Sequence, residues 1–148
     1  MNSKVKNLGI LVIIFAVISL VMGIVFVQQG FSKEAFLTEA MTEEQIELDG
    51  VEGVIDTPGE AQVAGDTVRE HRHGIAPTYG DLLGGERYDP TNPLQLTYAQ
   101  ALNLENYLYL AVASFGLTLM AKGMGAFMIV MGLALGVAGY GLISVAKQ

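Results

Sequence analysis

The 148-residue chain contains no cysteine. It therefore has no disulfide, thiolate nucleophile, iron–sulfur cluster, thioether-linked haem or lipid-modified cysteine anchor. The absence of disulfides does not restrict the chain to one compartment. It shows only that any domain outside the cytoplasm folds without covalent cross-links.

Two long stretches also have very little charge. Residues 8–27 carry no charged side chain, and residues 107–145 carry only Lys122. Neither stretch contains His, Asp, Glu or Arg, which excludes a pair of axial haem ligands, a proton relay or a buried ion site within them.

No catalytic motif can be assembled from the remaining residues. The sequence has no nucleophile elbow, no Gly-rich phosphate loop and no zinc-ligand spacing. We therefore expect a protein that is not an enzyme and that has no catalytic residue and no cofactor.

Acidic residues are confined to the middle of the chain. All 15 Asp and Glu lie between Glu34 and Glu105, and the four basic residues of the interval 28–105 leave it with a net charge of −11. Such a surface repels nucleic acid and anionic headgroups, so nucleic-acid binding is excluded. It suits a basic soluble protein partner instead.

Residues 8–27 have the length and flanks of a membrane helix. They form 20 uncharged residues preceded by Lys4 and Lys6, and about 20 apolar residues span a bilayer core. A cleaved signal peptide is the alternative, but its apolar core would be shorter and would end in a small-x-small site. We expect a retained anchor.

Residues 107–145 are too long for a single crossing. As one helix, these 39 residues would extend roughly 58 Å, against a hydrocarbon core of roughly 30 Å. Either Lys122 marks a bend between two short membrane segments, or one long helix enters the membrane from about Gly116. We favour the single helix, because residues 107–121 are too few for a comfortable crossing.

These features predict an all-α membrane protein with two transmembrane helices that flank a small, mostly helical extracytoplasmic domain. The expected parts are an anchor (1–27), an acidic domain (28–105) and a long C-terminal helix that begins above the membrane (106–148). The location of the lysines predicts that both termini lie in the cytoplasm and that the acidic loop lies outside.

Local signals divide the middle region. Residues 31–41 have helical spacing, so the first helix should continue beyond the membrane. Residues 45–55 alternate around Asp49-Gly50 and suggest a short hairpin. Thr57-Pro58-Gly59-Glu60 predicts a helix start with a capping box, with Gly74 as its end, and Asn92-Pro93 predicts a second start.

Glycines recur every seven residues in the second membrane segment, at Gly125, Gly132 and Gly139, and Gly136 completes a Gly-x-x-x-Gly pair with Gly132. Small residues on one face let another helix approach closely in lipid. We predict a helix-packing seam whose partner is either the chain's own first helix or another subunit, with Ala121, Met128 and Val145 near the same seam.

His71 and His73 are the weak candidates for a metal site. Residues two apart on a helix point about 200° from each other, so we expect solvated side chains and no metal. The tyrosines at 79, 88, 98, 107 and 109 suit packing or a membrane boundary better than ligand binding.

Four features lie along the chain: the anchor, the acidic loop with His73 before Thr78-Tyr79-Gly80-Asp81-Leu82, the Asp89-Pro90 step, and Ala113-Ser114-Phe115-Gly116 before a Gly- and Met-rich span. With these features the chain resembles small two-helix membrane proteins of actinobacteria and related bacteria. Some of those proteins bear a ring-opening oxygenase label, which implies an iron site. Two neighbouring histidines do not supply one. The resemblance therefore implies a membrane topology and no functional residue.

The leading hypothesis is an accessory or scaffolding subunit of a larger bacterial membrane assembly, in contact with lipid and with other membrane subunits or copies of itself. The alternatives are a self-assembling pore component and an extracytoplasmic ligand-binding or metal-dependent enzyme that uses His71 and His73.

Overall fold

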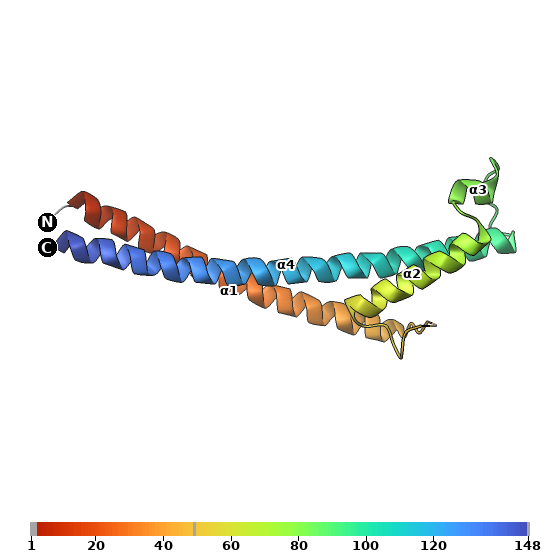
Figure 1. Ribbon diagram of the computed structural model, residues 1–148, viewed down its shortest axis with the longest axis horizontal. Coiled ribbons are helices and arrows are strands. Elements are labelled where there is room, and N and C mark those ends of the chain that lie inside the picture. Colours follow the sequence, from red (N-terminus) through yellow and green to blue (C-terminus); the bar gives the residue numbers. More distant parts are fainter. Residues whose placement is uncertain (1–2, 49, 148) are drawn as a thin grey trace. The chain divides into compact units, whose positions relative to one another are not determined.

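The computed structural model describes residues 3–48 and 50–147, and every regular element in these ranges is a helix. In chain order they are α1 (Ser3–Glu44), α2 (Pro58–Ile75), α3 (Tyr79–Leu83) and α4 (Pro93–Lys147) (Figure 1). The predicted all-α architecture is confirmed. α1 and α4 are each long and apolar enough to cross a membrane.

The chain forms two compact units. Unit 1 consists of Met1–Glu34 and Leu117–Gln148, and unit 2 consists of Ala35–Gly116. Both long helices contribute to both units. α4 continues without interruption past Lys122, as the single-helix interpretation predicted, and α1 continues past Gly30 to Glu44.

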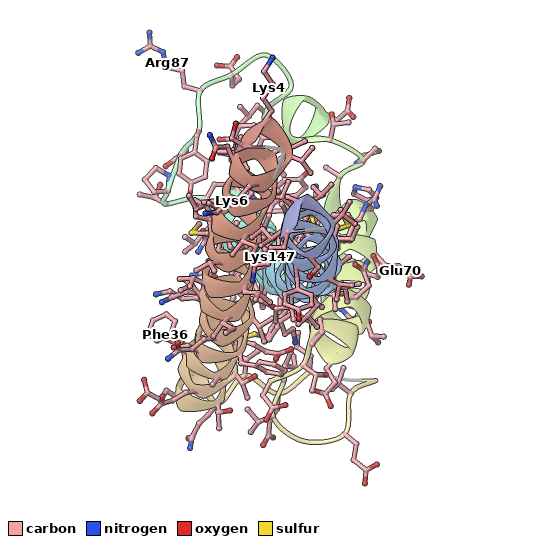
Figure 2. The ribbon with its side chains drawn as sticks, turned by 90° about the vertical axis from the view of Figure 1, so that its left-hand side faces the viewer. Lys4, Lys6, Phe36, Glu70, Arg87 and Lys147 are labelled. Carbon is pink, nitrogen blue, oxygen red and sulfur yellow. The ribbon has the colours of Figure 1, made fainter. Side chains whose placement is uncertain are left out.

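In unit 1, α1 and α4 lie side by side and run antiparallel (Figure 1). Lys4, Lys6 and Lys147 therefore belong to the same end of this helix pair (Figure 2). Large aliphatic side chains cover its outer surface, for example Ile24 at 58% and Val137 at 75% exposure. An apolar surface of this extent suits lipid chains, because soluble proteins rarely expose one to water.

The start of α2 shows why this segment becomes helical. Thr57 Oγ1 accepts the N–H of Glu60 at 3.3 Å, and Glu60 Oε2 accepts the N–H of Thr57 at 3.1 Å. Pro58 occupies the first turn, where its missing donor costs nothing. The predicted capping box is confirmed. These hydrogen bonds hold the pKa of the Glu60 carboxyl below its usual range, the Thr57 side chain being the largest cause.

Two local predictions are wrong. Gly74 does not end α2, which continues to Ile75 and stops where Ala76 turns extended. The expected hairpin over 45–55 is an irregular loop with no strand in the parts described, although the Ile55 N–H donates to the Ile46 carbonyl at 3.0 Å. Asp49 of the expected turn lies outside the described residues.

The core of unit 2 explains the loop. Ile55 is 1% exposed and packs with Ala61 and Ala64 of α2 and with Leu108 of α4. Burying such a side chain stabilises a fold by about 2 kcal/mol, which exceeds what an isolated two-strand ladder offers. The burial of Ile55 therefore determines the path of the loop, and the alternating pattern does not produce strands.

Small residues on α2 let this helix lie close to α4. A Cβ added at Gly65 would lie 3.1 Å from the Tyr109 ring, which is tighter than most real contacts. α2 continues through Gly65 without a break. The helical conformation of Gly65 is compensated by this close packing, which offsets the roughly 1 kcal/mol that glycine costs relative to alanine.

Candidate functional site

The predicted packing glycines of α4 lie against α1 of the same chain. A Cβ built at Gly125 would lie 2.7 Å from the Gly23 carbonyl oxygen, and one at Gly139 would lie 3.0 Å from the Gly9 carbonyl oxygen. At Gly132 it would lie 2.7 Å from Leu20 Cγ and 3.0 Å from the Ala16 carbonyl oxygen. No side chain fits at any of these three positions without moving the helices.

The matching positions on α1 form a second row of small residues with the same spacing. Gly9, Ala16, Gly23 and Gly30 are spaced by seven, and all four are buried. Going along α1, they meet Gly139, Gly132, Gly125 and Thr118 in turn, so the two rows run in opposite directions. The sequence prediction placed a seam on the second membrane helix and did not include this row, in which Ala16 takes the place of a glycine.

The remaining seam predictions differ in detail. Gly136 stands apart from the tight contacts, because a Cβ there would lie 3.9 Å from Ala16 Cβ, an ordinary contact distance. Val145 is 65% exposed, whereas Ala146 is 4% exposed and continues the seven-residue spacing from Gly139. The seam therefore follows a strict heptad, and the Gly-x-x-x-Gly pair contributes through Gly132.

Polar contacts also cross between the two helices of unit 1. The Ser19 hydroxyl donates to the Met128 carbonyl at 2.7 Å. Lys122 Nζ donates to Glu34 Oε2 at 2.7 Å and lies 4.8 Å from the centre of the Phe31 ring. Lys122 therefore has a carboxylate partner within the same chain.

In unit 2, Arg72 of α2 makes a buried polar cluster with α4. Its Nε donates to Glu105 Oε2 at 2.6 Å, its Nη2 donates to Glu105 Oε1 at 3.3 Å, and its Nη1 donates to the Tyr98 hydroxyl. Arg72 is 8%, Glu105 7% and Tyr98 0% exposed. The hydrogen bond to Glu105 is the main cause that raises the pKa of the Arg72 guanidinium.

Two aromatic neighbours complete this cluster. The Tyr79 and Tyr98 ring centres lie 6.1 Å apart, and His73 Nε2 lies 3.2 Å from Arg72 Nη2. Because the guanidinium can only donate, His73 can accept from it only with Nε2 unprotonated. The polar groups of this cluster hydrogen-bond to one another. Such an arrangement holds α2 against α4.

A second polar contact joins the same two helices nearer the start of α2. Tyr109 Oη donates to Asp66 Oδ1 at 2.6 Å. This hydrogen bond raises the pKa of the Tyr109 hydroxyl and lowers the pKa of the Asp66 carboxyl. Two of the predicted packing tyrosines, Tyr98 and Tyr109, thus tie α4 to α2.

His71 and His73 lie on α2, and His73 lies beside a cation. Within residues 3–48 and 50–147 no group of three or more His, Cys, Asp or Glu side chains could hold a metal ion.

Unit 2 also has an open groove of about 520 Å³ along one side of α4. Ile46, Leu104 and Leu110 supply apolar walls, and Asn103 and Tyr107 supply polar groups. No sequence motif indicated it, because its walls come from the loop after α1 and from the outer face of α4.

Replacing Gly132 with Leu should separate the two helices of unit 1. The added side chain meets Leu20 and the Ala16 carbonyl, so we expect α1 and α4 to move apart by roughly 2 Å, the difference between a glycine contact and ordinary helix packing. Spin labels on introduced cysteines at the exposed positions Ile10 and Val137 would report the distance in lipid. Leu133→Ala is the control, because Leu133 is 58% exposed and lies away from the seam. Equal label distances in the two variants would contradict the seam.

Replacing Arg72 with Ala should loosen α2 from α4. It leaves the Glu105 carboxylate buried without its partner, and breaking such a pair costs on the order of 3 kcal/mol. Hydrogen exchange of the α2 amides in the full chain would measure the loss. Arg69→Ala, at an exposed position of α2, should change exchange little, and comparable effects of the two variants would refute a specific role for Arg72.

Comparison of the chain with protein-family models, with curated proteins and with solved structures found no match.

Proposed function

We propose that this chain is a non-enzymatic accessory or scaffolding subunit of a larger bacterial membrane assembly, which presents an acidic helical domain to a basic protein partner. The exposed acidic surface of unit 2 is the observation that carries this proposal. Glu105 is buried beside Arg72, but other acidic residues of unit 2 are exposed, among them Glu43, Glu47 and Glu70. Figure 2 shows the Glu70 side chain projecting away from its helix.

Charge on such a surface acts on partner choice more than on stability. Interval 28–105 has a net charge of −11, and opposite potentials on two proteins speed their encounter and exclude wrong partners. The exposed carboxylates of unit 2 have few basic neighbours to neutralise them, because the interval holds only four basic residues. A basic partner supplies the missing charge.

The proposed location is the bacterial cytoplasmic membrane. Lys4, Lys6 and Lys147 share one end of unit 1, and Lys and Arg concentrate on the cytoplasmic side of membrane proteins. This orientation places both termini in the cytoplasm and unit 2 outside. The seam then serves as a close-packed anchor, since lipid offers helices no hydrophobic gain for associating and small residues supply the contacts.

Purification of the tagged chain from native membranes in mild detergent tests the proposal. We expect a protein with a basic extracytoplasmic region to co-purify in stoichiometric amount. The triple variant Glu43→Lys, Glu44→Lys and Glu47→Lys should reduce recovery at least about tenfold, since it changes the local charge by six. The control Glu86→Gln changes the charge at one exposed position only. Absence of a stoichiometric partner, or equal recovery with the triple variant, would reject the scaffolding role.

Topology is tested separately with single cysteines in this cysteine-free chain. An impermeant thiol reagent added to intact cells should label a cysteine at Thr57 and leave one at Ser3 unlabelled. Both positions should react after the membrane is permeabilised. Labelling of Ser3→Cys in intact cells would contradict the proposed orientation.

A further inference from the structure

The part of α4 that belongs to unit 2 has an unusual lack of charge. From Pro93 to Gly116 the sequence contains one charged residue, Glu105, and that side chain is 7% exposed and bound to Arg72. The outward face of α4 is therefore neutral inside an interval of net charge −11. Charged side chains are tolerated on a helix face that is exposed only to water, so their absence from this face calls for another explanation.

The residues on this outward face follow a coiled-coil pattern. Leu96, Gln100, Asn103, Tyr107 and Leu110 are spaced alternately by four and three residues, and all five are exposed. We call them the outer stripe. At about 100° per residue their mean direction lies about 120° around α4 from the core residue Leu108.

The outer stripe combines apolar and amide side chains. Leu96 is 40% and Leu110 is 66% exposed, while Asn103 and Tyr107 also line the groove beside α4. Asn at one core position of a parallel coiled coil fixes register and favours the dimer, because its amide can pair with the same amide of the other helix. The stripe therefore has two leucines that can pack and an asparagine that can pair with its counterpart across a twofold axis.

We propose that the outer stripe is a homodimer interface that pairs α4 with α4 of a second copy in parallel. The proposal rests on the proposed function in one respect, namely that unit 1 crosses the membrane. Two copies inserted with the same orientation then have parallel α4 helices, and residues of the same number meet across a twofold axis. Asn103 pairs with Asn103 of the other copy, and Leu110 enters the groove beside the other copy's Tyr107.

Electrostatics favours a second copy at this face over the other candidates. Two acidic domains repel each other except where they meet through neutral surface, and the outer stripe is such a surface. A basic partner would have little to pair with there, since Glu44 is the single charged residue in the groove lining. Lipid would leave the amides of Gln100 and Asn103 without hydrogen-bond partners, which is costly.

The short stripe does not need high intrinsic affinity. It covers 15 residues, and isolated helices of this length are marginal in water. Copies confined to one membrane with a fixed orientation have already lost much of the freedom that association would otherwise remove, and their effective concentration is high. The seam of unit 1 contributes no contact to this dimer because α1 already covers it.

Single-cysteine cross-linking in membranes tests the proposal with the full chain. Asn103→Cys should give a disulfide-linked dimer of twice the 15.8 kDa chain mass under mild oxidation, at least about fivefold more than Ala113→Cys. Ala113 is exposed on another face of the same helix. Val63→Cys, 48% exposed on α2, provides a second control.

A disruptive variant gives an independent measurement on purified chain in detergent. Leu110→Glu places one carboxylate from each copy against the other at a position exposed in the single chain, so folding should be retained while the dimer dissociates. Light scattering should give the dimer mass for the parent and for Val63→Glu, and the monomer mass for Leu110→Glu. Amide exchange of α2 checks that unit 2 remains folded in each variant.

Three outcomes would overturn the proposal. One is equal cross-linking at Asn103, Ala113 and Val63. Another is a cross-link from Asn103→Cys to a different protein, which would assign the face to a hetero-partner. The third is reaction of that cysteine with lipid-soluble reagent alone, which would place the face in the bilayer. Because purified chain alone should dimerise, failure to recover a basic partner would leave this result intact.

Discussion

The close approach of α1 and α4 is the constraint on which unit 1 depends. Backbone and side chain of one helix occupy the space where a Cβ of the other would stand, with separations of 2.7 to 3.0 Å at Gly125, Gly132 and Gly139. In lipid this contact must supply the association energy itself, because apolar side chains gain nothing by leaving one apolar medium for another. Two rows of small residues with the same seven-residue spacing also determine the alignment. A shift of one residue would place Ile or Leu against backbone and force the helices apart. The same alignment brings Ser19 to the Met128 carbonyl and Lys122 to Glu34, so these polar contacts follow from the register and do not create it.

Unit 2 solves the related problem of fixing two helices in water with a polar contact. A buried ion pair alone is weak evidence for stability, since removing both charges from water costs several kcal/mol per ion. Here the cost is offset because Arg72 directs three nitrogens to Glu105 and Tyr98, and no buried side-chain N or O atom of the described residues lacks a partner. α2 lies close enough to α4 for Arg72 to reach Glu105 and Tyr98, because the residues of α2 that face α4 include the small Ala61, Ala64 and Gly65. The small residues allow the short distance between the helices, and the charge-assisted hydrogen bonds between Arg72 and Glu105 require a defined geometry.

The features that the sequence predicted well depend on neighbouring residues. The Thr57 capping box, the start at Asn92-Pro93 and the continuity of α4 are decided within one helical turn or by apolar length, and all three appear as expected. The errors involve distant contacts. Alternation over 45–55 indicated strands, but burial of Ile55 against α2 determined the loop. The burial of Arg72 was not predicted, although its four-residue step from Val68 continues the buried stripe and Glu105 is the single acidic residue of α4. Those two observations together could have identified the pair. The row on α1 required Gly and Ala to be treated as equivalent, since packing depends on side-chain volume rather than residue type.

The internal use of the glycine seam changes where recognition by other molecules must occur. A packing face in a membrane helix is available to another subunit only if the chain itself leaves it uncovered, and α1 covers this one along its length. What unit 1 offers outward is aliphatic surface with little to distinguish one partner from another. Unit 2 differs, because it presents carboxylates over much of its surface and a neutral amide-containing face along α4. Specificity arises from groups whose partners are costly to omit, such as amides and charges, rather than from aliphatic area. Under the proposed function, unit 1 therefore serves as the anchor and unit 2 as the part that selects partners.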